Sequence, residues 1–147
     1  MTDRAPVAGP LRVLLTSTSS DAHSWNLVVL ELALRETSAG VCNLGPCAPD
    51  DLVIATARRE RPELIVVSSV NGHGFHDGLR LIGQVRSHAE LAGTPMVIGG
   101  KLGIAGPGCD RSRARLTAAG YGAVFEDGTG LTAFQSYVGR LAIGQAS

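Results

Sequence analysis

The 147-residue sequence predicts a single α/β domain, a doubly wound five-stranded parallel sheet with helices on both faces. Three observations indicate this fold. Short runs rich in Val, Ile and Leu recur five times, stretches of helical character lie between them, and Gly, Pro or Asp stands at several boundaries. Because strands that alternate with helices are joined by crossovers, we expect them to pair in parallel, with both faces of the sheet covered.

The apolar runs define the strands, and the segments between them define the helices. Strands are predicted at Arg12 to Thr16, Val41 to Leu44, Leu64 to Ser68, Met96 to Gly99 and Ala123 to Phe125. Helices are predicted at Leu27 to Ser38, Asp51 to Arg61, Leu79 to Ala89, Arg111 to Ala119 and Leu131 to Ile143. In the last helix Leu131, Phe134, Val138 and Leu141 have the spacing of one buried stripe.

Residues that commonly begin or end helices and strands stand near these boundaries. Asp50 precedes one helix, Gly40 and Gly120 follow two others, and Pro95 opens the fourth strand, where a missing N–H is tolerated. The first strand is as apolar as the third, so both are expected to be central. This favours the flavodoxin-like strand order 2-1-3-4-5, in which ligands bind outside the carboxyl ends of strands one and three.

Composition restricts the function. The chain has thirteen basic and thirteen acidic residues, and no run of one charge is long enough to favour a nucleic-acid or membrane partner. No apolar core of signal-peptide length lies in residues 1–10, and no stretch approaches the roughly 18 apolar residues of a membrane span, which favours a cytoplasmic protein. The three cysteines form no Cys-x-x-Cys motif and are interpreted as buried or bystander thiols in a reducing compartment.

The loop after the first strand contains an Asp-x-His pair, Asp21 and His23. In an extended segment, residues two apart project to the same face, so the Asp21 carboxylate can accept a hydrogen bond from one ring nitrogen of His23. The other nitrogen is then a fixed, more basic metal ligand. The alternative is that Asp21 only caps the following helix and His23 is a surface histidine.

Small and hydroxylated residues gather in the loops at the same predicted edge. They follow strand one (Thr16 to Ser20), strand three (Ser68 to Gly74), strand four (Gly99 to Gly103) and strand five (Glu126 to Gly130). Such an edge would let a long ligand run close to the backbone. The alternative is that these loops are Gly- and Ser-rich as in any fold of this type.

Several familiar sites fit the sequence poorly. The hydroxyl-rich loop after strand one is similar to the phosphate cradle of flavodoxins, but Trp25 is the only tryptophan available to flank a flavin. Response regulators place a phosphoacceptor Asp where this chain has Ser68 and Ser69. The Gly99-Gly100-Lys101 segment lacks the Walker pattern, because Leu102 occupies its Ser/Thr position.

Two further sites have weak support. His23, His73 and His76 could form a zinc site, but three histidines on separate turns are little evidence. A triad of Ser68 or Ser69 with His23 and Asp21 is conceivable, yet there is no nucleophile elbow of the G-x-S-x-G type.

Three motifs together resemble those of a known family. From about Arg12 to Val138 the chain resembles the cobalamin-binding small subunit of glutamate mutase (methylaspartate mutase), and more broadly the corrinoid domains of adenosylcobalamin mutases and methionine synthase. The family signature is Asp-x-His-x-x-Gly, then Ser-x-Leu after strand three, then Gly-Gly after strand four. Here the motifs stand as Asp21 to Asn26, Ser68 to Val70, and Gly99-Gly100, in the same order and on the corresponding loops.

The chain departs from this signature at two positions. Asn26 replaces the family glycine, and Val70 replaces the family leucine. Asn tolerates a positive φ, so the loop is expected to keep its shape. Val shortens one apolar contact by about one methylene, on the order of 1 kcal/mol.

The resemblance implies a cofactor, adenosylcobalamin, and a set of binding residues. His23 would be the lower axial cobalt ligand in place of the cofactor's dimethylbenzimidazole, with Asp21 orienting it. Ser68 and Val70 would line the benzimidazole pocket, and Gly99, Gly100 and Thr129 would let the nucleotide tail pass. The full predicted cofactor-binding set is Ser17, Ser20, Asp21, Ala22, His23, Ser24, Asn26, Ser68, Val70, Gly72, Gly99, Gly100, Lys101, Phe125, Gly128 and Thr129.

The resemblance also implies an activity. Residues 1–10 would be a flexible N-terminal segment and residues 11–147 a cobalamin-binding domain. The chain would be the small subunit of an isomerase that converts L-glutamate to threo-3-methylaspartate by radical rearrangement. It would have no catalytic residues of its own and would be inactive without a large TIM-barrel subunit.

Two alternative functions remain. One is a corrinoid carrier for methyl transfer, although such proteins usually have a helical bundle before this domain and only eleven residues precede Arg12 here. The other is a non-catalytic sensor module that binds cobalamin or has lost it.

Overall fold

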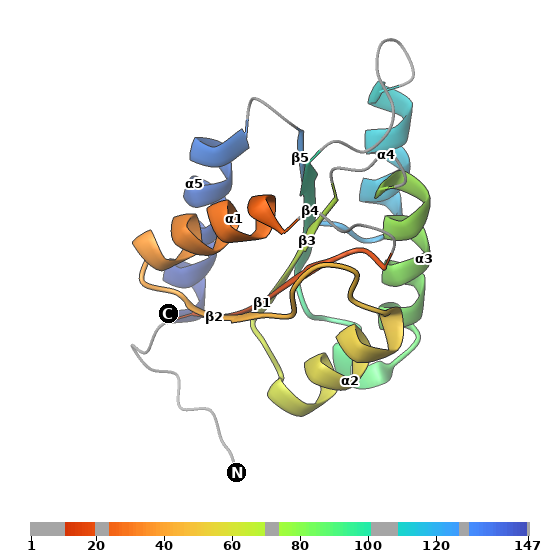
Figure 1. The fold of residues 1–147 in the computed structure, drawn as a ribbon, viewed down its shortest axis with the longest axis horizontal. Coiled ribbons are helices and arrows are strands. Elements are labelled where there is room, and N and C mark those ends of the chain that lie inside the picture. Colours follow the sequence, from red (N-terminus) through yellow and green to blue (C-terminus); the bar gives the residue numbers. More distant parts are fainter. Residues whose placement is uncertain (1–10, 20–23, 70–73, 101–108, 127–129, 147) are drawn as a thin grey trace.

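The fold is described by a computed structural model that covers residues 11–19, 24–69, 74–100, 109–126 and 130–146. Strands and helices alternate along the chain (Figure 1). In order they are β1 (Arg12–Ser17), α1 (Trp25–Glu36), β2 (Gly40–Asn43), α2 (Asp50–Glu60), β3 (Leu64–Ser68), α3 (Gly74–Arg86), a 3-10 turn η1 (Ala89–Leu91), β4 (Met96–Gly100), α4 (Cys109–Ala119), β5 (Ala123–Glu126) and α5 (Gly130–Ala146).

The strands form one five-stranded sheet in the order β2-β1-β3-β4-β5, and every neighbouring pair is parallel. The predicted fold class and strand order are therefore confirmed. The winding direction reverses between β1 and β3, so the carboxyl ends of these two strands form the switch point of the sheet.

The two faces of the sheet have separate cores, because successive strand residues point to opposite sides. Leu14 of β1 and Ile65 of β3 belong to the core beneath α2, α3 and α4. Their neighbours Val13 and Val66 belong to the core beneath α1 and α5. Figure 1 shows α1 and α5 on one side of the sheet and the other three helices on the opposite side.

Helix α3 begins at Gly74, five residues before the predicted start at Leu79. The first turn contains His76 and Asp77, which obscured the helical pattern, but Phe75 is buried in the core. Gly78 lies where the helix packs closely on the sheet, since an added Cβ would be 2.5 Å from Cδ1 of Ile98. The prediction was therefore too short at this end.

Other boundaries differ by one to three residues. Asp50 is the first residue of α2, after the N-cap Pro49, and does not precede the helix. Helix α1 ends at Glu36. Ser38, with a φ of 67°, adopts the left-handed conformation that glycine commonly adopts after a helix. Gly40 is consequently the first residue of β2.

The cysteine interpretation needs one correction. Cys42 and Cys47 are both exposed, so neither is a buried thiol. Cys42 lies on β2, the strand at one edge of the five-stranded sheet. The bystander interpretation remains a prediction.

Candidate functional site

Four of the predicted site residues lie in one row across the sheet. The parallel register pairs Ser17 of β1 with Ser68 of β3, Ser68 with Gly99 of β4, and Gly99 with Phe125 of β5. The row runs along the carboxyl ends of the strands, and Gly100 follows Gly99 as the last residue of β4. The structure thus brings together residues that are more than a hundred positions apart in the sequence.

Buried hydroxyl groups line the switch point between β1 and β3. Ser17, Thr18, Ser68 and Ser69 are each at most 2% exposed. The Ser17 hydroxyl donates to the Gly45 carbonyl at 2.9 Å and accepts from the Ala48 N–H at 3.2 Å. These bonds fix the end of β1 against the loop that leads into α2.

The N-cap of α1 is Ser24, which is exposed and makes no side-chain capping bond. Asp21, which the alternative interpretation made a helix cap, lies outside the described residues. Trp25, the only tryptophan of the chain, opens α1 and is 75% exposed.

Asn26 joins α1 to β3. Its side-chain Nδ2 donates a hydrogen bond to the Ser68 Oγ at 2.6 Å. Asn26 is a helical residue and is not among the residues with positive φ. The ability of Asn to adopt a positive φ, which was the argument from the sequence, is therefore not needed at this position. The amide that replaces the family glycine instead binds a hydroxyl that was predicted to line the cofactor pocket.

A double-mutant cycle tests this contact. Asn26→Ala and Ser68→Ala are each expected to lower the free energy of unfolding by about 1 kcal/mol, because each leaves a partly buried partner without its bond. In urea denaturation, the double variant should lose less free energy of unfolding than the two single variants lose together, by about 0.5–1.5 kcal/mol. Asn26→Ala combined with the distant Ser87→Ala should be additive. Strict additivity of the first pair would show that the bond does not form.

Gly99 is required by the sheet itself. A Cβ at this position would lie 2.9 Å from the Phe125 carbonyl oxygen and 3.4 Å from the Phe125 Cβ. The Phe125 ring packs edge-on against Phe134 and Tyr137 of α5, with centroids 5.6 Å and 6.0 Å away. Its predicted contact with a cofactor therefore stays a prediction.

Arg80 of α3 was not predicted as a site residue. Its guanidinium contacts Ser19, directly after β1, as well as Asp50 and Asp77. The spacing of Asp77 and Arg80 is visible in the sequence as a helical pair, whereas contacts with Ser19 and Asp50 depend on the fold.

The other predicted site residues lie outside the described residues. They are Ser20, Asp21, Ala22, His23, Val70, Gly72, Lys101, Gly128 and Thr129. His73 is also outside, and His76 is an exposed residue of the first turn of α3. Within the described part of the chain, no three His, Cys, Asp or Glu residues are grouped to hold a metal ion.

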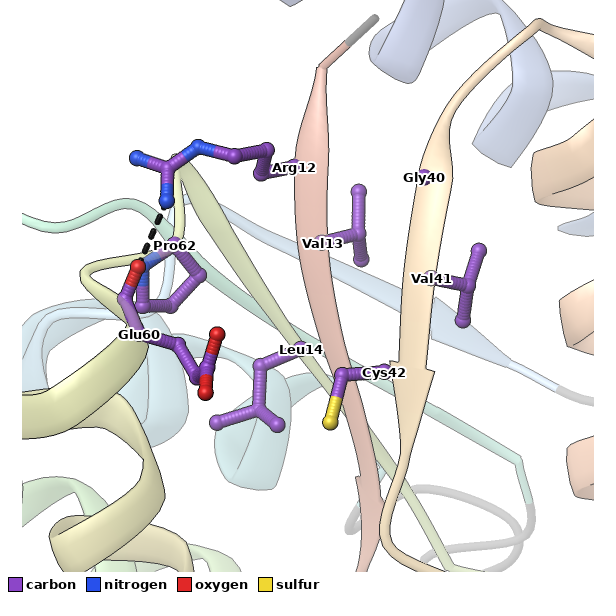
Figure 2. Close-up of a pocket in the computed structure, with 8 residues that line it drawn as sticks. All are labelled: Arg12, Val13, Leu14, Gly40, Val41, Cys42, Glu60 and Pro62. Atoms are coloured by element: carbon purple, nitrogen blue, oxygen red, sulfur yellow. Dashed lines mark hydrogen bonds between the residues drawn. The ribbon is translucent and has the colours of Figure 1, made fainter. Parts of the chain in front are cut away.

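A hollow of about 190 Å³ lies at the opposite edge of the sheet, near the amino ends of β1 and β2 (Figure 2). Arg12 borders it, but its guanidinium donates to the carbonyls of Glu60 and Arg61, both at 2.6 Å. The arginine therefore caps the end of α2. The hollow is separate from the row of candidate residues at the carboxyl ends, and its lining is Arg12, Val13, Leu14, Gly40, Val41, Cys42, Glu60 and Pro62.

Comparison with known proteins decides the family. The model of the B12 binding domain family matches residues 11–130. This chain belongs to the B12 binding domain family. The match includes every strand, the row of candidate residues and the Asp21-x-His23 loop.

One curated relative of this B12 binding domain is the glutamate mutase sigma subunit of Treponema denticola. The two are 30% identical over 125 residues, which are 84% of this chain and 88% of the relative. Two solved structures share the fold. A cobalamin-binding protein from Desulfitobacterium hafniense has a TM-score of 0.72 and 14% identity, with 90% of this chain and 59% of that chain covered.

The second structure is the receiver domain of a signal transduction histidine kinase from Syntrophus aciditrophicus. Its TM-score is 0.68 at 18% identity, with 93% and 92% of the two chains covered. The fold of the B12 binding domain therefore occurs with different functions, and the function must be argued from its residues. Among the described helices, none has the length and apolar character needed to cross a membrane.

Proposed function

We propose that this B12 binding domain is the cobalamin-carrying subunit of an adenosylcobalamin-dependent carbon-skeleton mutase, with L-glutamate and threo-3-methylaspartate as its substrate and product. The observation that supports this most directly is the match to a glutamate mutase sigma subunit over 84% of the chain. The motifs of the resemblance lie within the matched region.

The chemistry of the described residues fits a corrinoid with a nucleotide tail. Such a tail offers phosphate, ribose and amide groups, which pair with hydroxyl and amide side chains. The switch point holds the hydroxyls of Ser17, Thr18, Ser68 and Ser69 within the sheet edge, and the Asn26 amide beside them. The absence of a side chain at Gly100 would let a ligand approach the last residue of β4 closely.

The resemblance implies the roles of two residues. A His23 ring nitrogen would hold cobalt, and the Asp21 carboxylate would fix the tautomer and raise the basicity of that nitrogen. When bound, adenosylcobalamin would supply the radical chemistry that the rearrangement needs. The chain's own residues bind and orient the group. Substrate binding and the catalytic side chains belong to a separate large subunit with a TIM-barrel fold.

The experiment combines the purified chain with adenosylcobalamin and a candidate large subunit, and measures loss of glutamate. We expect turnover only when both proteins and the cofactor are present. The exposed Trp25 reports binding independently, since a corrinoid absorbs where tryptophan emits and would quench its fluorescence. Binding without turnover would identify a methyl-transfer carrier or a sensor instead, and absence of binding would overturn the proposal.

A further inference from the structure

The guanidinium of Arg80 joins three segments of the chain. Nη2 donates to the Ser19 hydroxyl at 2.8 Å, Nε donates to Oδ2 of Asp50 at 2.8 Å, and Nη1 donates to Oδ1 of Asp77 at 3.0 Å. Asp50 opens α2, Asp77 lies in the first turn of α3, and Ser19 follows β1. One side chain therefore connects the first crossover loop to two helices on the other face of the sheet.

The arginine is itself held firmly. The side chains of Asp50 and Asp77 are only 12% and 11% exposed, and their bonds to Arg80 are charge-assisted. The bond to Asp50 also raises the pKa of Arg80. Two residues before Arg80, the Gly78 carbonyl accepts a 2.8 Å hydrogen bond from the buried hydroxyl of Tyr121. This bond fixes α3 against the segment that enters β5.

Ser19 marks where the chain leaves the sheet. Ser17, two residues earlier, is tied to Gly45 and Ala48, and Ser19 is tied to Arg80. His23 follows four residues later. On the far side of His23, Asn26 is bound to Ser68. Residues 20–23, which include His23, therefore lie in the sequence between two residues of the described chain that are held by side-chain hydrogen bonds, Ser19 and Asn26.

We propose that Arg80 is a positioning residue for cobalamin binding, which acts by holding Ser19 and thereby the start of the segment that contains His23. This inference rests on the proposed function. Arg80 acts through Ser19, and the two acidic residues fix the direction of its guanidinium.

The test uses Ser19→Ala, which removes the acceptor and leaves Arg80 bound to both carboxylates. Ser19→Ala and Arg80→Met are each expected to weaken cobalamin binding about tenfold, as removal of a residue that orients a metal ligand does. The fraction of bound cobalamin with a histidine-type absorption spectrum should fall in both. The double variant should bind no more weakly than Arg80→Met alone, because the contact that Ser19→Ala removes, Arg80 to Ser19, is already lost in Arg80→Met.

Arg58→Met is the matched control, since Arg58 pairs with Glu90 through one exposed ion pair between other elements. We expect this variant to bind cobalamin as the unaltered chain does. If Ser19→Ala remains folded and binds with unchanged affinity and spectrum, the role of Arg80 is disproved, whether or not Arg80→Met folds. If the unaltered chain binds no cobalamin, the proposed function itself fails.

Discussion

His23→Ala is expected to weaken cobalamin binding by on the order of 100-fold and to abolish the histidine-type absorption spectrum. Removing a residue that only orients a metal ligand typically costs about 10–100-fold in affinity, and loss of the ligand should reach at least the upper end. Asp21→Ala should fall within that range, because it leaves the imidazole present but unoriented. Affinity is measured by quenching of Trp25 fluorescence during titration.

His76→Ala is the matched control for this prediction. His76 is exposed in the first turn of α3, and its ring lies edge-on to Phe75 with centroids 5.2 Å apart. Its removal should leave cobalamin affinity and spectrum unchanged. Unaltered binding by His23→Ala, together with an unaltered spectrum, would rule out His23 as the cobalt ligand.

Gly99→Val is expected to lower the free energy of unfolding by about 1–3 kcal/mol, the range for an overpacked interior. The obstacle is the Phe125 carbonyl oxygen 2.9 Å from the new Cβ, and a backbone atom of a neighbouring strand cannot rotate away. The Gly99 carbonyl also accepts from the Ser69 N–H at 3.0 Å, so a shifted β4 would disturb the end of β3. Urea denaturation measures the loss, and cobalamin titration measures its effect on the site.

Gly83→Ala is a control that should raise the free energy of unfolding, whereas Gly99→Val should lower it. Gly83 lies within α3, and an added Cβ would meet no atom within 4 Å. Alanine is favoured over glycine in a helix by about 0.5–1 kcal/mol, so this variant should be more stable than the unaltered chain. If Gly99→Val were as stable as the unaltered chain, the close approach of β4 and β5 would not constrain position 99.

The strands and their order were predictable because the strands are short and mostly apolar, and the central strands β1 and β3 are buried along almost their whole length. Leu64 to Ser68 was predicted with the bounds that β3 has. The ends of the helices were harder to predict from the sequence, because the first turns contain both polar side chains and buried ones. Asp77 in α3 is an example, because it lies before the predicted start of the helix at Leu79 and is only 8% exposed in the fold.

The location of the site on the fold could be predicted from the sequence better than the contacts between its residues could. The rule for open α/β sheets located the edge, and the register then aligned Ser17, Ser68 and Gly99 there. The bond between Asn26 and Ser68 and the bond between Arg80 and Ser19 join residues 42 and 61 positions apart. No local pattern records such pairings, because they arise only when the helices pack on the sheet.

The axial bond from His23 to cobalt can be tested directly by electron paramagnetic resonance of the chain reconstituted with Co(II) cobalamin. The histidines are labelled with the heavy nitrogen isotope, whose spin of one half splits each cobalt line into a doublet, whereas ordinary nitrogen gives a triplet. Our account predicts doublets with labelled protein and triplets without labelling. Triplets in both samples would show that the cofactor's own base remains on the metal and would contradict the assignment.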